Sequence, residues 1–186
     1  MMLEDAIAGR RAVRDYLPAP VDERTIGRLI DAAIQAPSAI NQQPWTFTVV
    51  RDPAVLDRIS RDAKAFMLDA LQGDRHAASM RQHLADPGFH IFYHAPALIL
   101  ISAAAQGPWI VEDCALAAQN LMLAAFAAGL GSCWIGFAQR YLASPAGKAV
   151  LGLPPDWVPV APIIVGRPAG AAPPVTRRPP EVRWIG

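Results

Sequence analysis

Apolar residues recur at helical spacing in several stretches of the chain. A short stretch covers Leu3–Arg10, and a longer one begins after Asp22, which can cap a helix, and runs as far as Pro37. Proline cannot extend the helical hydrogen-bond ladder, so Pro37 is expected to stop that helix. A third amphipathic stripe runs from Val55 to Leu71, with Gly73 as its expected end.

Short apolar runs of strand length separate these helical stretches. Thr46–Val50 is rich in β-branched residues, whereas Ala97–Ser102 and Val160–Val165 are continuous apolar runs typical of interior strands. Ser132–Phe137 is predicted to be a further strand, and Pro145–Leu151 a short helix.

The most apolar helical segment is Trp109–Leu130. A membrane span is the alternative, but Glu112 and Asp113 lie at one end, Gln119 and Asn120 fall in the middle, and much of the apolar content is alanine. A helix that is apolar on nearly all faces is expected in a protein core or a subunit interface. We therefore predict no membrane association.

The order of these elements predicts a single α+β domain over residues 1–186, with helices on a central sheet. Residues 74–94 have a weaker pattern, for which we expect a short helix and a mobile loop. Residues 167–186 are dominated by Pro, Gly, Ala and Arg and cannot form a core of their own. Trp184 and Ile185 at the end of this tail suggest that it is extended and docked against another surface.

Composition narrows the class of protein. The 186 residues include 17 Lys and Arg against 16 Asp and Glu, a formal net charge of +1, so the overall balance does not point to nucleic acid or to acidic lipid. Cys114 and Cys133 form no disulfide pattern, and the first residues lack the features of a secretory signal. These observations favour a soluble protein of a reducing cytoplasm.

The loop Ala36–Trp45, with the sequence APSAINQQPW, is rich in side-chain amides. Ser38, Asn41, Gln42 and Gln43 offer donors and acceptors that no regular ladder uses. Such a loop either bonds to itself or forms the wall of a pocket.

Arginines provide the clearest local charge. Arg10 and Arg14 are four residues apart, so with Arg11 they can converge on one face if the helical turn persists, and such a group suits a phosphate. The alternative is a solvated basic helix end. Arg177 and Arg178 in the tail leave the same two readings open.

Other chemistry is weakly supported. His90 and His94 have the spacing of helical zinc ligands, but the H-E-x-x-H motif is absent and Pro96 follows, so we predict no metal site. Neither cysteine has the signature of a catalytic nucleophile. Gly129, Gly131 and Gly136 do not form G-x-G-x-x-G, which excludes a Rossmann dinucleotide site, but they would allow a ligand to approach the backbone closely.

Several segments together, in this order, resemble the nitroreductase family of FMN-dependent oxidoreductases. They are RRAVRDY, APSAINQQPW, AAGLGSCWIGF, APIIVGRP and RRPPE, and they span nearly the whole chain. The resemblance implies an α+β homodimer with a mixed or antiparallel sheet, a long buried helix at the dimer interface, and one FMN at each of two interface sites. The tail 167–186 would then dock on the partner subunit.

The resemblance also implies roles for individual residues. The FMN phosphate and ribityl chain would be held by Arg10, Arg11 and Arg14, with Arg177 or Arg178 from the tail. The partner subunit would supply the loop residues around the flavin, which are Pro37, Ser38, Ala39, Asn41 and, with less support, Gln43. The backbone at Ile135 and Gly136 would address N5 and O4 of the ring.

The implied activity is hydride transfer from NADH or NADPH through flavin N5 to a flat conjugated acceptor, such as a nitroaromatic or a quinone, in a ping-pong cycle. Because the flavin would carry this chemistry, we predict no catalytic side chain. Two alternatives stay open: a specialised enzyme of the same fold that dehalogenates, oxidises a substrate or breaks down flavin, and a flavin-binding protein without turnover. Phe89, Phe92 and Tyr93 would form a substrate lid or belong to the core.

Overall fold

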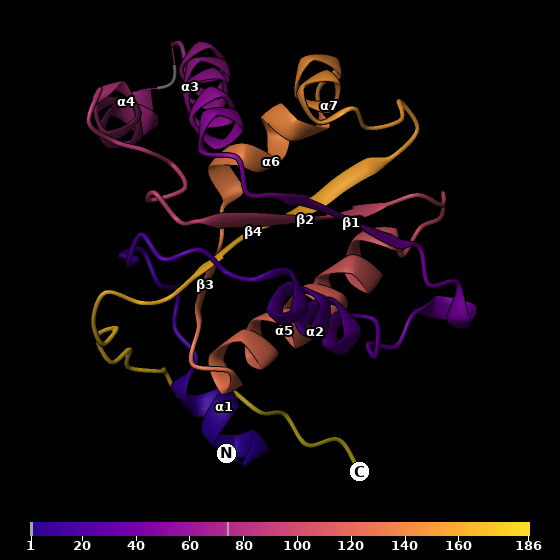
Figure 1. The fold of residues 1–186 in the computed structure, drawn as a ribbon. Coiled ribbons are helices and arrows are strands. Elements are labelled where there is room, and N and C mark those ends of the chain that lie inside the picture. The colour runs from indigo at the N-terminus through magenta and orange to yellow at the C-terminus, as the bar shows by residue number, and fades with distance from the viewer. Residues whose placement is uncertain (1, 74) are drawn as a thin grey trace.

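The computed structural model describes residues 2–73 and 75–186, in which one four-stranded sheet is covered by helices on both faces (Figure 1). The strands pair antiparallel in the order β1-β2-β4-β3, and they are β1 (Trp45–Val50), β2 (Ala97–Ala103), β3 (Gly131–Trp134) and β4 (Val158–Gly166). The predicted α+β class is confirmed, and the sheet is of the antiparallel type.

The two central strands are apolar throughout because the sheet is buried on both sides. All seven residues of β2 are buried. Along β2, Ile99 and Ile101 belong to the core on one face, whereas Leu98 and Leu100 belong to the core on the other. This alternation divides the interior into two hydrophobic layers.

One layer lies between the sheet and the helices α2 (Glu23–Ala33) and α5 (Ile110–Ala127). Asp22 caps α2 as predicted, since Oδ1 accepts a hydrogen bond of 2.8 Å from the Thr25 N–H. The helix ends at Ala33 rather than at Pro37, because the Ala36 N–H turns back to the carbonyl of Ala33 at 3.1 Å.

Within the described residues, α5 is the one helix that is long and apolar enough to cross a membrane by length and composition. Its buried side chains, among them Ala117, Leu121 and Ala125, join the core beneath the sheet. Val111 and Leu116 on α5 are exposed at 51% and 46%. The helix therefore has the packing of a core helix and also presents apolar side chains to the surface.

The opposite layer lies beneath a second group of helices, drawn above the sheet in Figure 1. They are α3 (Pro53–Ala70), α4 (Ala78–Ala85), α6 (Gly136–Ala143) and α7 (Pro145–Leu151). The prediction of a strand over Ser132–Phe137 is wrong at its end, because Gly136 is the first residue of α6. Phe137, Ala138, Tyr141 and Leu142 give α6 a helical spacing that the preceding apolar run concealed.

The weakly patterned segment 74–94 contains the predicted short helix, α4, although its first residue, Asp74, lies outside the described residues. Phe92 is fully buried and belongs to the core, whereas Phe89 and Tyr93 are half-buried. The lid interpretation therefore fails for Phe92 and stays open for Tyr93.

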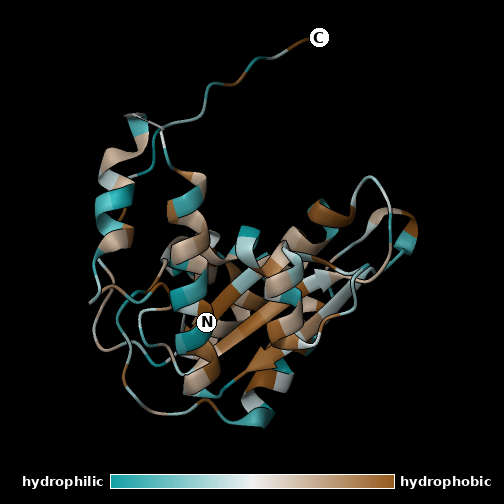
Figure 2. Ribbon diagram, turned by 90° about the horizontal axis from the view of Figure 1, so that it is seen from above, coloured by the Kyte–Doolittle hydropathy of each residue, from teal (hydrophilic) through white to brown (hydrophobic). Residues whose placement is uncertain are grey.

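The tail leaves the body of the molecule as an extended chain (Figure 2). Trp184 and Ile185 are 92% and 95% exposed within the single chain. Their docking on a partner subunit stays a prediction.

Candidate functional site

The arginine segment is extended rather than helical. The helix α1 (Leu3–Gly9) ends before Arg10, and the Val13 N–H donates to the carbonyl of Ser132 at 3.1 Å, beside a parallel bridge between Ala12 and Ser132. The expected helical turn is therefore wrong, because the segment pairs with β3 instead. In an extended chain alternate residues share a side, so Arg10 and Arg14 are still placed on the same side.

Three glycines were expected to let a ligand approach the backbone closely, and the structure leaves space for a ligand at one of them, Gly136. A Cβ at Gly131 would lie 2.7 Å from the Cβ of Val13, so this glycine allows the arginine segment to approach β3. Gly129 has a φ of +73° and follows the C-cap of α5, Ala128, where a left-handed glycine commonly ends a helix. At Gly136, a Cβ would meet nothing within 4 Å, which leaves room for a ligand.

Arg10 and Arg11 line a pocket of about 280 Å³ beside the C-terminal part of α5 and the start of the tail. The Arg11 guanidinium is already used in part, since Nη1 donates to the carbonyls of Ala8 at 2.6 Å and Arg10 at 2.9 Å, at the end of α1. The Ser132 hydroxyl lines the same pocket and is buried without a hydrogen-bond partner in the part of the chain described. It could therefore bond to a polar ligand there.

Arg14 lies in another pocket, of about 220 Å³, that also includes Ile135 and Gly136. Its guanidinium carbon is 6.0 Å from the ring centroid of Tyr93. Burial raises the pKa of the Tyr93 phenol and of the Cys133 thiol, and the nearby Arg14 charge only partly opposes this, so both groups are neutral at pH 7. The pocket thus combines a cation with neutral aromatic and sulfur side chains.

Neither Arg10 nor Arg14 has a carboxylate within ion-pair distance among residues 2–73 and 75–186. Neither charge is therefore neutralised by a carboxylate in this part of the chain, although the Arg14 guanidinium lies against Tyr93 and Cys133. This arrangement is compatible with the phosphate interpretation for these two residues, whereas the Arg11 guanidinium bonds in part to the end of α1.

The start of α6 supplies backbone groups to the Arg14 pocket. The Ile135 N–H is used, because it donates to the Pro162 carbonyl at 2.8 Å. Gly136 is exposed, and as the first residue of α6 its N–H has no intrahelical acceptor. Of the two residues predicted to address a ligand through the backbone, Gly136 therefore has the available donor.

The amide loop bonds to itself and is also exposed. The Gln43 N–H donates to Ser38 Oγ and the Gln43 side chain to Asn41 Oδ1, both at 2.9 Å. Ile40, Asn41 and Gln43 adopt left-handed backbone conformations, with φ of 49°, 57° and 48°. Such conformations are unfavourable for non-glycine residues and concentrate at functional sites. The loop, which includes the exposed Pro37, lines neither arginine pocket of its own chain.

Asp113 fixes this loop and was missed as a site residue. Its side chain is 3% exposed, and Oδ1 accepts a hydrogen bond of 2.9 Å from the Ala39 N–H, while Oδ2 is buried without a partner in the described chain. The sequence interpretation treated Asp113 only as a carboxylate at a helix start. An acidic residue within an apolar helix was the available signal.

The loop and the arginines lie at opposite ends of α5 (Figure 1). The loop is bonded to Asp113 in the first turn of the helix, whereas a Cβ at Gly9, beside Arg10, would touch the ring of Phe126 near its end. Phe126 follows Asp113 by 13 positions, which corresponds to about 20 Å along the helix. One chain therefore does not bring the two groups of predicted residues together.

Arg177 and Arg178 are exposed and lie in the extended tail, away from both arginine pockets. Which of them could approach a phosphate stays open. Cys114 and Cys133 are free and buried, and burial raises the pKa of Cys114 to about 12, as expected for thiols without a nucleophilic role.

Comparison with known proteins identifies a family for this chain. The sequence profile of the Nitroreductase family matches residues 7–167. An Archaeoglobus fulgidus protein named "Putative NADH dehydrogenase/NAD(P)H nitroreductase" is 33% identical over 159 residues, which cover 86% of this chain and 81% of the relative.

Solved structures extend the comparison to the fold. An FMN-bound nitroreductase from Bacteroides fragilis has a TM-score of 0.82 and 26% identity, and the match covers 100% of this chain and 98% of the other. An iodotyrosine deiodinase bound to FMN and 3-iodo-L-tyrosine has a TM-score of 0.77 at 24% identity, with 100% of both chains covered. The fold is therefore shared by enzymes that act on different substrates.

Proposed function

This chain belongs to the nitroreductase family of oxidoreductases, and we propose that it is an FMN-dependent enzyme that uses NADH or NADPH to reduce a flat conjugated acceptor. The observation on which this rests is the pocket that joins Arg14 to Ile135 and Gly136. These residues are far apart in sequence. The family resemblance assigns Arg14 to the phosphate end of FMN, and Ile135 and Gly136 to its ring.

The residues present fit FMN in charge and in shape. Arg10 and Arg11 line one pocket with Ser132, whose hydroxyl has no partner in the described chain, and Arg14 lines the other. The three arginines would together hold the phosphate. Gly136 would leave room for the ring and offer its free N–H to the ring edge. When bound, FMN supplies the hydride chemistry, accepting the hydride at N5 and passing it on, so no side chain is required as nucleophile or base.

The complete site is proposed to form only in a homodimer. The loop residues Pro37, Ser38, Ala39, Asn41 and Gln43 would serve the flavin held by the arginines of the partner subunit. The spacing of about 20 Å along α5 supports this, because it separates the two groups within one chain. The exposed apolar side chains of α5, Val111 and Leu116, would be covered in the interface, with the tail 167–186 docked on the partner.

Tyr93 and Phe137 are proposed to face the acceptor, since both line the Arg14 pocket. Aromatic side chains favour flat partners through stacking, which suits a nitroaromatic or a quinone. Catalysis in a reducing cytoplasm agrees with two free, buried thiols. A specialised substrate is the second possibility, because the deiodinase shares the fold.

The first experiment follows the colour of the purified protein. A yellow protein that bleaches when NADH or NADPH is added without oxygen, and regains its colour when a nitroaromatic or a quinone follows, would support the proposal. Yellow that persists with both nucleotides would indicate a binding protein without turnover. A colourless protein that cannot be reconstituted with FMN would refute the flavin assignment.

The second experiment tests the arginine assignment. Arg14→Ala removes one charge-assisted contact to the phosphate, so the Kd for FMN should rise by about thirtyfold, equivalent to about 2 kcal/mol. Arg140→Ala is the matched control, because Arg140 is exposed on α6 and lies outside the pocket. Unchanged FMN affinity in Arg14→Ala would remove Arg14 from the site.

A further inference from the structure

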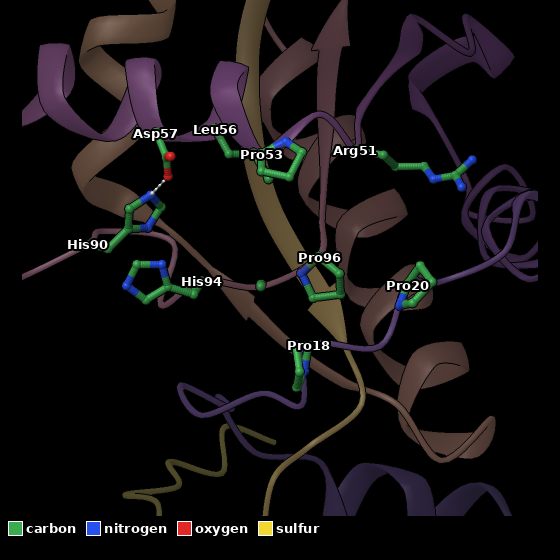
Figure 3. A pocket seen from close by; sticks show the side chains of 10 residues that line it. Pro18, Pro20, Arg51, Pro53, Leu56, Asp57, His90, His94 and Pro96 are labelled. Atoms are coloured by element: carbon green, nitrogen blue, oxygen red, sulfur yellow. Dashed lines mark ion pairs between the residues drawn. The ribbon is translucent and has the colours of Figure 1, made fainter.

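A third pocket, of about 280 Å³, lies between the start of α3 and the turn that precedes β2 (Figure 3). None of the residues predicted to bind flavin lines it. Its polar side chains include Asp57, His90 and His94, and Figure 3 shows the two imidazoles and the carboxylate grouped at one side of the pocket.

These three side chains have the spacing of metal ligands. One donor atom from each lies within 4.8 Å of the others. His90 Nε2 is 3.2 Å from Asp57 Oδ1, and the rings of His90 and His94 stack with centroids 4.5 Å apart. A tetrahedral zinc ion with ligands at about 2.0–2.1 Å requires donor atoms about 3.3 Å apart. One pair already meets this distance, and the exposed His94, which lies outside any helix or strand, can rotate to supply the third atom.

An ordinary ion pair accounts poorly for the cluster. His90 Nε2 is buried and makes no contact of hydrogen-bond geometry within the described chain, although Asp57 is close. Two imidazoles and a carboxylate therefore lie together without a hydrogen bond between His90 and Asp57 in the described chain, and this set of donors suits a metal ion.

We propose that Asp57, His90 and His94 bind a divalent transition metal of the zinc class. Two imidazoles and one carboxylate are a known zinc donor set that leaves a fourth position for water or another ligand, and here that position would open into the pocket. Magnesium and calcium prefer oxygen ligands and are disfavoured by the two nitrogens. The sequence prediction of no metal site is replaced by this proposal, because Asp57 supplies the acidic ligand that the sequence around the histidines lacks.

Besides the rotation of His94, binding requires a local rearrangement at His90. The Phe92 N–H donates to His90 Nδ1 at 3.2 Å, which places the imidazole proton on Nε2. Ligation through Nε2 would move this proton to Nδ1 and break the long contact with Phe92. The site is thus close to a binding geometry without being fully formed, so metal should bind more weakly than at a fully organised zinc site.

The experiment is calorimetric titration of Zn²⁺ into the full chain, freed of metal with a chelator and without a histidine tag. One Zn²⁺ per chain is expected for the unaltered protein. Asp57→Asn and His94→Ala should each raise the Kd by about tenfold or more, because each removes a ligand. Both side chains are exposed, so these variants keep the fold where a His90 variant could lose it.

His83→Ala is the matched control, since His83 is an exposed histidine on α4 outside the cluster. It should leave Zn²⁺ binding unchanged. Absence of Zn²⁺ binding to the unaltered protein, or equal binding by the Asp57 and His94 variants, would overturn the proposal. The result does not depend on FMN, so it stands or fails separately from the proposed oxidoreductase activity.

Discussion

The bond between Asp113 and the amide loop gives the most informative test of how the site is built. Asp113→Ala removes the acceptor of the Ala39 N–H, a bond of 2.9 Å to a carboxylate that is 3% exposed. Hydrogen bonds to charged groups contribute about 1.5–3 kcal/mol. The substitution also removes the orphaned Oδ2, whose burial is unfavourable, so we expect a loss near the lower end, about 2 kcal/mol.

The control is Glu112→Ala. Glu112 and Asp113 both lie in the first turn of α5 and interact with the helix dipole, but Glu112 is exposed and holds no loop residue. Its removal should lower stability by about 0.5 kcal/mol. In scanning calorimetry at equal protein concentration, Asp113→Ala should lower Tm by about 4–8 °C and Glu112→Ala by about 1–2 °C.

Asp113→Asn separates the bond from the charge. The amide keeps an acceptor oxygen for the Ala39 N–H, so it should recover most of the loss in Tm. FMN affinity should fall in Asp113→Ala alone, because the loop would be released from the position that serves the partner. Equal shifts in Asp113→Ala and Glu112→Ala, with equal FMN affinity, would refute the role assigned to this bond.

Three further outcomes follow from the packing. Gly131→Ala should lower both Tm and FMN affinity, since its Cβ would lie 2.7 Å from the side chain of Val13. Gly136→Ala should leave Tm unchanged and weaken FMN binding alone, because its Cβ meets nothing within 4 Å in the protein. Calorimetry and flavin titration would distinguish these two outcomes. Cys114 and Cys133 are buried, so a thiol reagent at pH 7 should modify neither until the chain is unfolded, and rapid modification of the folded protein would contradict this burial. The pKa of Cys114 is raised from its usual value of 9.0 to about 12, so between these values the folded state retains a proton that the unfolded state loses. The contribution of this thiol to the free energy of unfolding should therefore be complete below pH 9 and be lost as the pH rises toward 12. Urea titrations over this range should show a smaller decrease in the free energy of unfolding for Cys114→Ala.

The central strands could be predicted because burial on both faces produces a continuous apolar run in the sequence. β2 and β4 are covered on both faces, so apolar residues occupy nearly every position and the runs stand out from the chain. Asp22 was recognisable as a cap for a similar reason, since the bond to Thr25 is local.

The start of α6 could not be placed from the same kind of evidence. The run from Ser132 to Phe137 stays apolar across the end of β3 and the beginning of the helix, and Gly136 carries no side chain to mark the change. Asp113 is 74 residues from Ala39 in the chain, so only the tertiary fold shows what it holds. The two histidines of the proposed metal site were visible, but Asp57 reaches them from another element.

The distance between the amide loop and the arginine segment has a further consequence for assembly. If each flavin is held by two chains, FMN binds the dimer in preference to the monomer, and cofactor binding and association become linked equilibria. Dilution should release FMN, excess FMN should oppose dissociation, and Tm should rise with protein concentration. A newly made chain would then acquire its cofactor at a rate that depends on meeting a second copy, so the length of α5 couples flavin occupancy to the abundance of the protein.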